Sequence, residues 1–238
     1  MSVVRREPIP NTHVMLITGR RNYVVVSDMH LGMESEYIEK GINIPYRTRD
    51  IADKIRTLLD EYDADLVLMG DIKHSITMEG APAVKLFFRL LSNYLIHIIP
   101  GNHDGGISRL VGVNVKVHSS RGTVIENTGL FHGHATPFEY VLAAPWLVMG
   151  HLHPSVLLRD RLGVSRNMPC WLKGTWKRKK VIVMPAFNSL IRGTPVNNFS
   201  GNTGPFLKNV DFERFRVYLT DGSYLGTVKS ISHLTGIQ

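Results

Sequence analysis

The stretch LIHIIPGNHD, residues 95–104, decides the fold class of this chain. An apolar run from Leu95 to Pro100, rich in β-branched isoleucine, gives way at once to the polar cluster 101–104. Short apolar runs that end at turn residues are typical of buried strands. The sequence therefore predicts a strand with Asn, His and Asp side chains placed directly at its carboxyl end.

The same arrangement occurs five times along the chain. In open α/β sheets, ligands bind beyond the carboxyl ends of the strands, where neighbouring loops converge. We therefore expect the polar side chains of all five clusters to meet in one place. The other four runs are Tyr23–Ser27 before Asp28-Met29-His30, Asp65–Met69 before Gly70-Asp71, Gly129–Phe131 before His132-Gly133-His134, and Trp146–Met149 before Gly150-His151-Leu152-His153.

Helical spacing separates some of these runs. Arg47–Tyr62 and Pro82–Tyr94 carry apolar residues three and four positions apart, which predicts helices. Strands that alternate with helices imply βαβ units and parallel pairing. From Val113 onward the runs are shorter and closer, which fits a second, more antiparallel sheet. We expect one α/β domain over residues 1–238, with two sheets packed face to face and helices outside (αββα).

The composition excludes several classes of protein. Cys170 is the one cysteine, so no intrachain disulfide forms, and its apolar neighbours predict a buried, inert thiol. No apolar run approaches the roughly 20 residues of a membrane span. The first 13 residues contain no apolar core of a signal peptide. We expect a soluble, cytoplasmic protein without a membrane partner.

The positive charge is concentrated in one segment. The chain has 28 Lys and Arg against 20 Asp and Glu, and residues 155–200 contain nine basic residues and one acid, so they account for the whole excess of +8. Such a segment suits a polyanion, and the alternative is a solvated loop. Trp171 and Trp176 lie among these cations and could stack bases or cover the second sheet. The expected nucleic-acid contacts are Arg159, Arg161, Lys177, Arg178, Lys179 and Lys180.

The residue types at the strand ends indicate metal chemistry. Oxygens from Asp and Asn together with imidazole from His suit Mn, Fe or Zn. Two carboxylates, one amide and up to seven His are too many ligands for one ion, but they fit two ions about 3.5–4 Å apart with a bridging carboxylate. No thiolate takes part, so a zinc finger is excluded. His97, inside the apolar run, is interpreted as structural.

These motifs resemble the signature of the calcineurin-like metallophosphoesterases. The resemblance covers residues 23–155 and rests on Asp28-x-His30, Gly70-Asp71, Gly101-Asn102-His103-Asp104 and Gly150-His151-x-His153 in this order. His74, three residues after Asp71, is similar to a His of SbcD-type nucleases that lies beside the phosphate. The short chain, Met184–Phe187 and Gly193 are similar to compact SbcD-related archaeal phosphoesterases and to ligase-associated PdeM. The capping domain and coiled coil of SbcD nucleases are missing, so processive action at double-strand ends is not expected.

The resemblance also implies a role for each residue. His103 faces the phosphate and the leaving group, Asp104 orients His103 through its other ring nitrogen, and His74 contacts the phosphate as well. His132 is favoured over His134 as a ligand because it lies nearer the strand end, which leaves His134 as a phosphate contact or a structural residue. The first metal is bound by Asp28, His30 and His153, Asp71 bridges, and the second metal is bound by Asn102, His132 and His151.

Three functions compete at this point. The first is a dinuclear phosphoesterase, with manganese expected and Fe, Zn, Ni or Mg as alternatives, that hydrolyses the phosphodiester bonds of nucleic acid and has a DNA-repair helicase or ligase as partner. The second is a hydrolase of small phosphoesters, such as cyclic nucleotides or phosphomonoesters. The third is a non-catalytic scaffold, which the intact set of ligands disfavours. Substrate, native metal and oligomeric state stay open.

Overall fold

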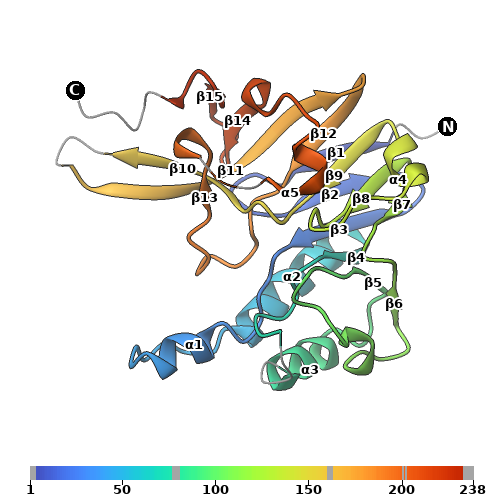
Figure 1. The fold of residues 1–238 in the computed structure, drawn as a ribbon. Coiled ribbons are helices and arrows are strands. Elements are labelled where there is room, and N and C mark those ends of the chain that lie inside the picture. The colour runs from blue at the N-terminus through green and yellow to red at the C-terminus, as the bar shows by residue number, and fades with distance from the viewer. Residues whose placement is uncertain (1–3, 77–80, 160–162, 200, 202, 233–238) are drawn as a thin grey trace.

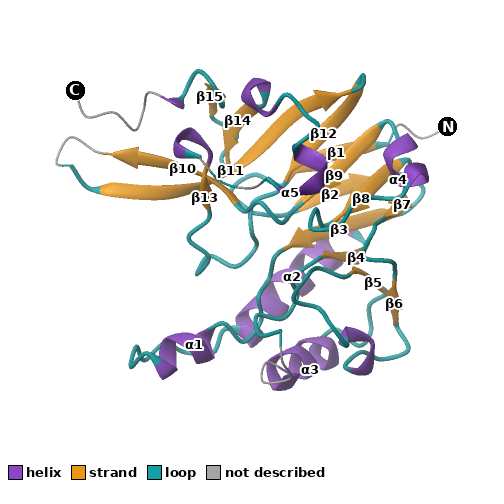
Figure 2. Cartoon of the chain, in the orientation of Figure 1, coloured by secondary structure: helices purple, strands orange, loops and turns teal. Residues whose placement is uncertain are grey.

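The computed structural model describes residues 4–76, 81–159, 163–199, 201 and 203–232. Two β-sheets lie face to face, with helices α2 and α3 against the outer side of the first sheet (Figures 1 and 2). The predicted αββα architecture is therefore confirmed. Within the described ranges, no helix has both the length and the apolar character needed to cross a membrane.

The first sheet has the strand order β1-β2-β3-β4-β5-β6. The β1–β2–β3 part is antiparallel, and β3 to β6 are all parallel, as the strand–helix alternation predicted. The strands are Arg5–Pro8, Met15–Thr18, Asn22–Ser27, Ala64–Met69, Ile96–Ile99 and Val115–Val117, and the helices that belong to this half are α1 Glu34–Glu39, α2 Thr48–Tyr62 and α3 Ala81–Leu90.

The second sheet has the order β13-β10-β11-β12-β9-β8-β7, and β14 with β15 is attached to β11. It mixes parallel pairs (β8–β9, β9–β12) with antiparallel hairpins. Its strands are β7 Thr123–Ile125, β8 Thr128–Phe131, β9 Trp146–Met149, β10 Pro154–Arg159, β11 Ser165–Trp176, β12 Lys179–Val183, β13 Thr194–Pro195, β14 Arg216–Leu219 and β15 Tyr224–Thr227, accompanied by α4 Glu139–Ala143 and α5 Gly204–Leu207. Short 3-10 helices span Ile107–Arg109, Val196–Asn198 and Phe212–Arg214.

Alternating side chains of the strands fill three core layers. On β4, Leu66 and Leu68 pack toward α2 and α3, whereas Val67 and Met69 pack between the sheets. The period of two along a strand produces this division, since successive side chains point to opposite faces. Both faces of each central strand are therefore buried, which explains why these runs are continuously apolar in the sequence.

Two expectations about the elements differ from the structure. The run at 113–117 was expected in the second sheet, but β6 pairs with β5 in parallel and extends the first sheet. The loop after β5 returns the chain to the free edge of β5, where β6 pairs. The chain therefore enters the second sheet only after β6. The expected helix at 82–94 ends at Leu90, and Leu91 to Tyr94 form a turn that leads into β5. The β1–β2 hairpin and α1 were not predicted, since neither has a long periodic pattern.

Candidate metal centre

The polar clusters meet where the two sheets converge at the carboxyl ends of their strands. Asp28 and Asp71 follow the parallel strands β3 and β4, and the Asp28 amide donates to the Gly70 carbonyl at 3.1 Å. His132 and His151 follow the parallel strands β8 and β9. Parallel pairing places each pair of ends at one edge of its sheet, and face-to-face packing brings the two edges together.

Two groups of metal-binding atoms form there, and Asp71 belongs to both. Asp28, His30, Asp71 and His153 make the first group, and Asp71, His132 and His151 make the second. Within each group the ligand atoms lie within 4.8 Å of one another. The two groups bring together the predicted ligands other than Asn102, with Asp71 at the position predicted for the bridge. The arrangement itself, with one carboxylate shared between two sets of imidazoles, is what two neighbouring cations require.

Buried polar atoms without partners show that this donor set fits metal ions. Both ring nitrogens of His30 are buried and make no hydrogen bond within the described structure, and Nε2 of His153 is buried with Oδ1 of Asp28 as its neighbour at 3.0 Å. Asp28 and His132 are fully buried. Burial of unpaired polar groups is unfavourable unless a ligand satisfies them, and a divalent metal at each group would do so.

The backbone of the ligand residues is held in a strained conformation. Positive φ angles are uncommon for residues other than glycine, and they concentrate at functional sites. The packed strand ends hold the backbone here because the donors have to turn sharply inward. The residues concerned are Asp28 (φ 58°), His30 (φ 44°), Asp71 (φ 47°), His151 (φ 67°) and His153 (φ 48°).

Two glycines next to the ligands allow this close approach. A Cβ atom on Gly70, whose φ is 80°, would collide with the ring of His132. A Cβ atom on Gly150 would collide with the Ser27 hydroxyl and would lie 2.5 Å from Oδ2 of Asp28. The glycine of each motif is thus required by the ligand of a neighbouring strand rather than by its own turn alone.

The electrostatics of the centre couple its acids to its histidines. Burial by itself would raise the pKa of Asp28, but the His153 and His132 rings hold it well below its usual range. Their Nε2 atoms lie 3.0 and 2.8 Å from Oδ1 of Asp28. Burial lowers the pKa of His30 and of His151 to about 4, so both rings stay neutral near pH 7. Neutral imidazole is the form that binds metal.

Comparison with known families agrees with this geometry. Residues 22–184 match the family described as calcineurin-like phosphoesterase. The chain belongs to this family. The matched range includes every strand end that supplies a donor.

One solved structure has a similar fold, and a second gives a weaker match. Nuclease MPE of Pseudomonas putida is 21% identical, with a TM-score of 0.52, and the match covers 91% of this chain and 98% of that chain. A predicted phosphoesterase of Streptococcus pneumoniae TIGR4, described as a conserved uncharacterized protein, is 13% identical with a TM-score of 0.34 over 87% of this chain and 94% of that chain. None of the curated proteins matches this phosphoesterase in sequence.

Two of the three predicted catalytic residues of this phosphoesterase lie beside the donors. The ring of His103 is 5.1 Å from that of His30, and its Nε2 atom is 4.0 Å from Oδ2 of Asp71. The ring of His74 is 5.6 Å from His30 and stacks on His103 at 6.4 Å. Both imidazoles border the first donor group from one side, where a phosphate bound to the metals would be within reach.

The expected contact between Asp104 and His103 is wrong. Nδ1 of His103 lies 2.6 Å from the carbonyl oxygen of His74, which takes the place expected for Asp104. The carboxylate of Asp104 is buried and instead accepts hydrogen bonds from the backbone amides of Ile72, Lys73 and Gly101. Asp104 therefore ties together the loops after β4 and β5, and it acts on His103 only through the backbone.

The structure distinguishes His132 from His134. Nε2 of His132 lies 2.8 Å from Asp28 Oδ1 and 3.7 Å from Asp71 Oδ2, so it faces the donors. His134 contacts the other nitrogen of that ring, with 3.0 Å between the two Nδ1 atoms. His134 is thus placed to hold the His132 ring. Of these two histidines, the donor groups found among the described residues include His132 and not His134. Asn102 is exposed at the turn after β5, and its predicted role as a ligand stays a prediction.

The predicted nucleic-acid contacts do not form one track. Residues 155–159 run away from the centre along β10, and β11 returns past the centre at Pro169, which pairs with Ser155. The chain then continues to Trp176 at the far end of β12, because Trp176 pairs with Lys179 while Val183 pairs with Met149 beside the centre. Arg159, which pairs with Ser165, and the segment Lys177–Lys180, which follows Trp176, therefore lie at opposite ends of β11, and Arg161 falls outside the described residues.

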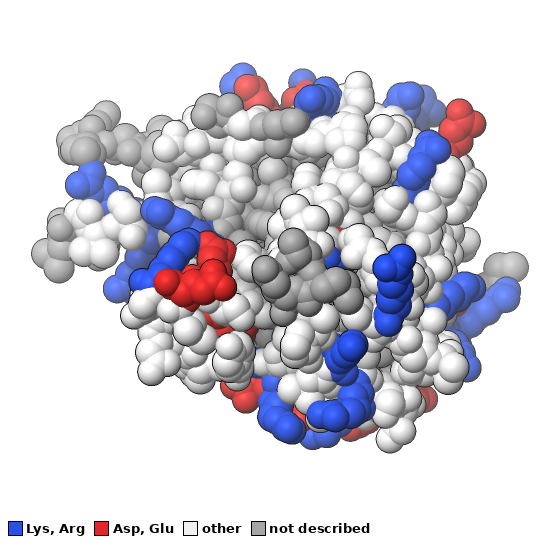
Figure 3. Space-filling view, turned by 60° about the horizontal axis from the view of Figure 1, so that its bottom comes forward, with Lys and Arg blue, Asp and Glu red and all other residues white. Residues whose placement is uncertain are grey.

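The expectation of a basic path that starts at the metal centre is therefore wrong. Residues 155–200 are continuous in sequence, but strand pairing places their basic residues in different parts of the sheet. In the view of Figure 3, Lys and Arg side chains form separate groups, some at the edges and some to the right of and below the centre. The segment Lys177–Lys180 lies four strand residues from the centre, roughly 13 Å at the rise of a β-strand.

Other residues behave as structural residues. Trp171 is fully buried between the sheets, and the ring of Trp176 packs edge-on against Phe206 at 5.2 Å, so packing is the correct interpretation for both. Cys170 is buried, as predicted. Nδ1 of His97 lies 2.9 Å from Nε2 of His118 on the neighbouring strand end, away from the metal centre.

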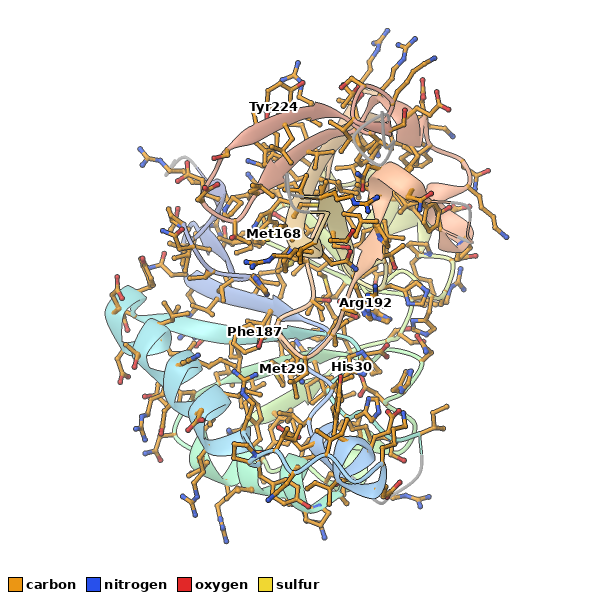
Figure 4. All side chains as sticks on the ribbon, turned by 90° about the vertical axis from the view of Figure 1, so that its left-hand side faces the viewer. Met29, His30, Met168, Phe187, Arg192 and Tyr224 are labelled. Atoms are coloured by element: carbon orange, nitrogen blue, oxygen red, sulfur yellow. The ribbon has the colours of Figure 1, made fainter. Side chains whose placement is uncertain are left out.

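Three residues that the sequence reasoning missed support the centre. Ser27 lies with its hydroxyl 2.5 Å from Oδ2 of Asp28. Glu36 on α1 lies with Oε2 2.7 Å from Nε2 of His74. Asn188 donates to the carbonyl of Met29, and Figure 4 shows Met29, His30 and Phe187 close together where this loop passes. Ser27 directly precedes Asp28, so adjacency could have indicated it, but no local pattern points to Glu36 or Asn188.

Proposed function

We propose that this chain is a dinuclear metal-dependent phosphodiesterase that acts on nucleic acid. One observation carries the proposal: two donor groups share Asp71, and beside it both buried ring nitrogens of His30 make no hydrogen bond within the described structure. A mononuclear or structural site would not need a second set of histidines around the same carboxylate. His30, His132, His151 and His153 would hold the metals together with Asp28, Asp71 and Asn102.

The side chains around the donors supply the remaining chemistry. Two divalent metals, when bound, polarise the phosphoryl oxygens and make hydroxide available near neutral pH. His103 is oriented by the carbonyl of His74 through Nδ1, which leaves Nε2 directed at the centre. A protonated Nε2 can stabilise charge on a phosphate oxygen and can donate a proton to the leaving oxygen. His74, stacked beside it, would contact the same phosphate.

Nucleic acid is proposed as the substrate on two grounds. The Pseudomonas putida protein with this fold is a nuclease. The net charge of +8 favours association with a polyanion. Manganese as the native metal, a role in DNA repair, a helicase or ligase partner and a cytoplasmic location belong to the same proposal.

The test is hydrolysis by the purified chain of single-stranded DNA, duplex DNA, RNA and a small chromogenic phosphodiester. Chelator should abolish hydrolysis, and manganese should restore it. Asp71→Ala should bind neither metal, whereas Asp53→Ala, which removes an exposed carboxylate on α2, should behave as wild type. Full activity after chelation would contradict the two-metal reading. If the chain hydrolyses the small diester but none of the three nucleic acids, the small-phosphoester hydrolase would be favoured.

A further inference from the structure

A groove of about 480 Å³ lies at the end of the second sheet that is remote from the metal centre. Strands β9, β11, β12 and β14 form it. Its walls combine basic and aromatic side chains. The basic residues are Lys173, Lys180, Arg214 and Arg216, and the aromatic residues are the partly buried Trp146 and Tyr218.

Strand register alternates the two kinds of side chain. Lys180 pairs with Trp146 across β12 and β9, and its Nζ lies 4.5 Å from the centre of the indole ring. Lys173 pairs with Arg216 across β11 and β14, and its Nζ lies 4.9 Å from the Tyr218 ring. The aromatic row continues outward, because Tyr224 on β15 is 54% exposed and its ring lies 5.2 Å from that of Tyr218.

The charge of the groove is largely uncompensated. Asp211 is the acid in its wall, and it is paired with Arg214 at 2.9 Å. Within the described part of the chain, no carboxylate forms an ion pair with Lys173, Lys180 or Arg216. Cations that lie on aromatic rings, free of acidic partners, remain available to phosphate groups, and the exposed ring of Tyr224 beside them is available to a flat ligand.

The groove is separate from the metal centre. Val183 of β12 pairs with Met149 at the centre, and Lys180 lies three residues earlier on the same strand, roughly 10 Å away. In Figure 4, Tyr224 lies near the top of the view, and His30 lies below its middle. A ligand in the groove would therefore not contact the metals, and the residues that bind it can be changed without altering the donors.

We propose that this groove is a second binding site for single-stranded nucleic acid. Phosphates contact Lys173, Lys180 and Arg216, and an unpaired base stacks on Tyr224. Single strands are favoured over duplex because the base faces, which duplex DNA buries in its stack, are what exposed tyrosines bind. The inference rests on the proposed function for its substrate class, and it adds a site that would retain a long strand while the metal centre acts on another part of it.

The experiment measures fluorescence anisotropy of a labelled single-stranded DNA oligonucleotide with the full chain in chelator, so that metals play no part. Lys180→Ala with Arg216→Ala should weaken binding on the order of tenfold at low salt, and the slope of log affinity against log salt should fall by about 1.4 for two lost phosphate contacts. The matched control is Lys177→Ala with Arg178→Ala, which removes the same charge from an exposed turn next to the groove. The control pair should change binding much less.

A third variant tests the aromatic part. Tyr224→Ala should weaken binding by about fivefold or more, the low end for a stacked base, with the salt slope unchanged. Equal losses of binding affinity in the groove pair (Lys180→Ala with Arg216→Ala) and the control pair (Lys177→Ala with Arg178→Ala) would overturn the site, because they would show a nonspecific charge effect. Duplex that binds as tightly as the single strand, together with a silent Tyr224→Ala, would overturn the single-strand assignment.

Failure of the site and failure of the proposed function give different results. Hydrolysis of the small diester with manganese reports the metal centre alone, and it should be the same in wild type, groove pair and control pair. A chain that binds the oligonucleotide through the groove but hydrolyses no phosphodiester retains the site and loses the proposed function. A chain that hydrolyses DNA while the groove pair binds it like wild type retains the function and loses the site.

Discussion

At the scale of the residue, the centre depends on a few side chains whose surroundings differ although their types are the same. Seven histidines lie in or beside the donor groups, and their roles follow from what each ring nitrogen faces. His30 makes no hydrogen bond and its Nε2 lies 3.8 Å from Asp71, His132 faces two carboxylates, and His103 is held by a carbonyl. Partner geometry, not residue type, therefore separates ligands from catalytic groups.

His103 is expected to act in the chemical step without holding metal. His103→Ala should keep both metals and lower kcat by roughly 10²–10⁴-fold, since it removes a general acid and leaves every donor intact. Metal content by elemental analysis and turnover of the small diester are the two measurements. A variant that loses metal would make His103 a ligand instead.

Glu36 is expected to position His74. Glu36→Ala should lower kcat by about 2- to 10-fold, the effect of one hydrogen bond, because the His74 ring loses the acceptor at Nε2. Glu36→Gln keeps an acceptor oxygen and should restore most of the activity. Glu39→Ala, on an exposed position of the same helix, is the matched control.

Steady-state kinetics in the His74→Ala background provide the decisive comparison for Glu36. Glu36→Ala should have no further effect there, because the ring that it holds is gone. An equal loss in both backgrounds would show that Glu36 acts independently of His74, for example by stabilising α1.

At the scale of the element, strand pairing decides which neighbours in sequence become neighbours in space. The β11 strand passes the metal centre and continues to the far side, so the basic residues at its two ends are separated. Strand β11 also pairs with β14, which brings Lys173 and Arg216 together although 42 residues lie between them in the sequence. A charge count along the chain therefore finds basic segments, whereas only the sheet makes a basic surface.

The β5–β6 edge is expected to make stability depend on pH. Burial, His97 and Lys116 together lower the pKa of His118 to about 4, and burial lowers that of His97 as well. The unfolded chain, with histidine pKa values near 6.5, binds protons more readily than the folded chain. The stability that these neutral rings contribute is present above about pH 6.5 and is lost as pH falls toward 4.

Urea unfolding in chelator at pH 7 and at pH 4.5 measures this effect. His118→Asn should lose less stability than wild type between the two pH values, because one depressed titration is removed while the metal-centre histidines are common to both proteins. An identical loss in the two proteins would show that the pair does not contribute to the pH dependence.

At the scale of the whole molecule, the metal centre links the two sheets. Asp28 and Asp71 come from the first sheet, and His132 comes from the second. The imidazole of His132 already lies within 2.8 Å of Asp28 across the interface. Metal binding should therefore stabilise the sandwich itself, since the ions bind the assembled sheets and not the separated ones.

Thermal unfolding with and without manganese tests this linkage. At a metal concentration 100 times Kd, the expected stabilisation is about 2.7 kcal/mol, which corresponds to a rise in Tm of about 5–10 °C for a chain of this size. Asp71→Ala should unfold at a Tm that manganese does not change. A wild-type Tm that is insensitive to manganese would contradict the fit of the donors to a metal.

The sequence by itself determined the fold class, the central strands and the histidine and aspartate donors. Those features are local: an apolar run has to be a buried strand, and the polar residues that follow it have to lie at its end. Only the tertiary structure decided which groups share Asp71, that a carbonyl and not Asp104 holds His103, that Glu36 supports His74, and that the basic segment is divided between two sides. These features depend on contacts between residues far apart in the chain, and no local period or spacing encodes the pairing of strands that creates them.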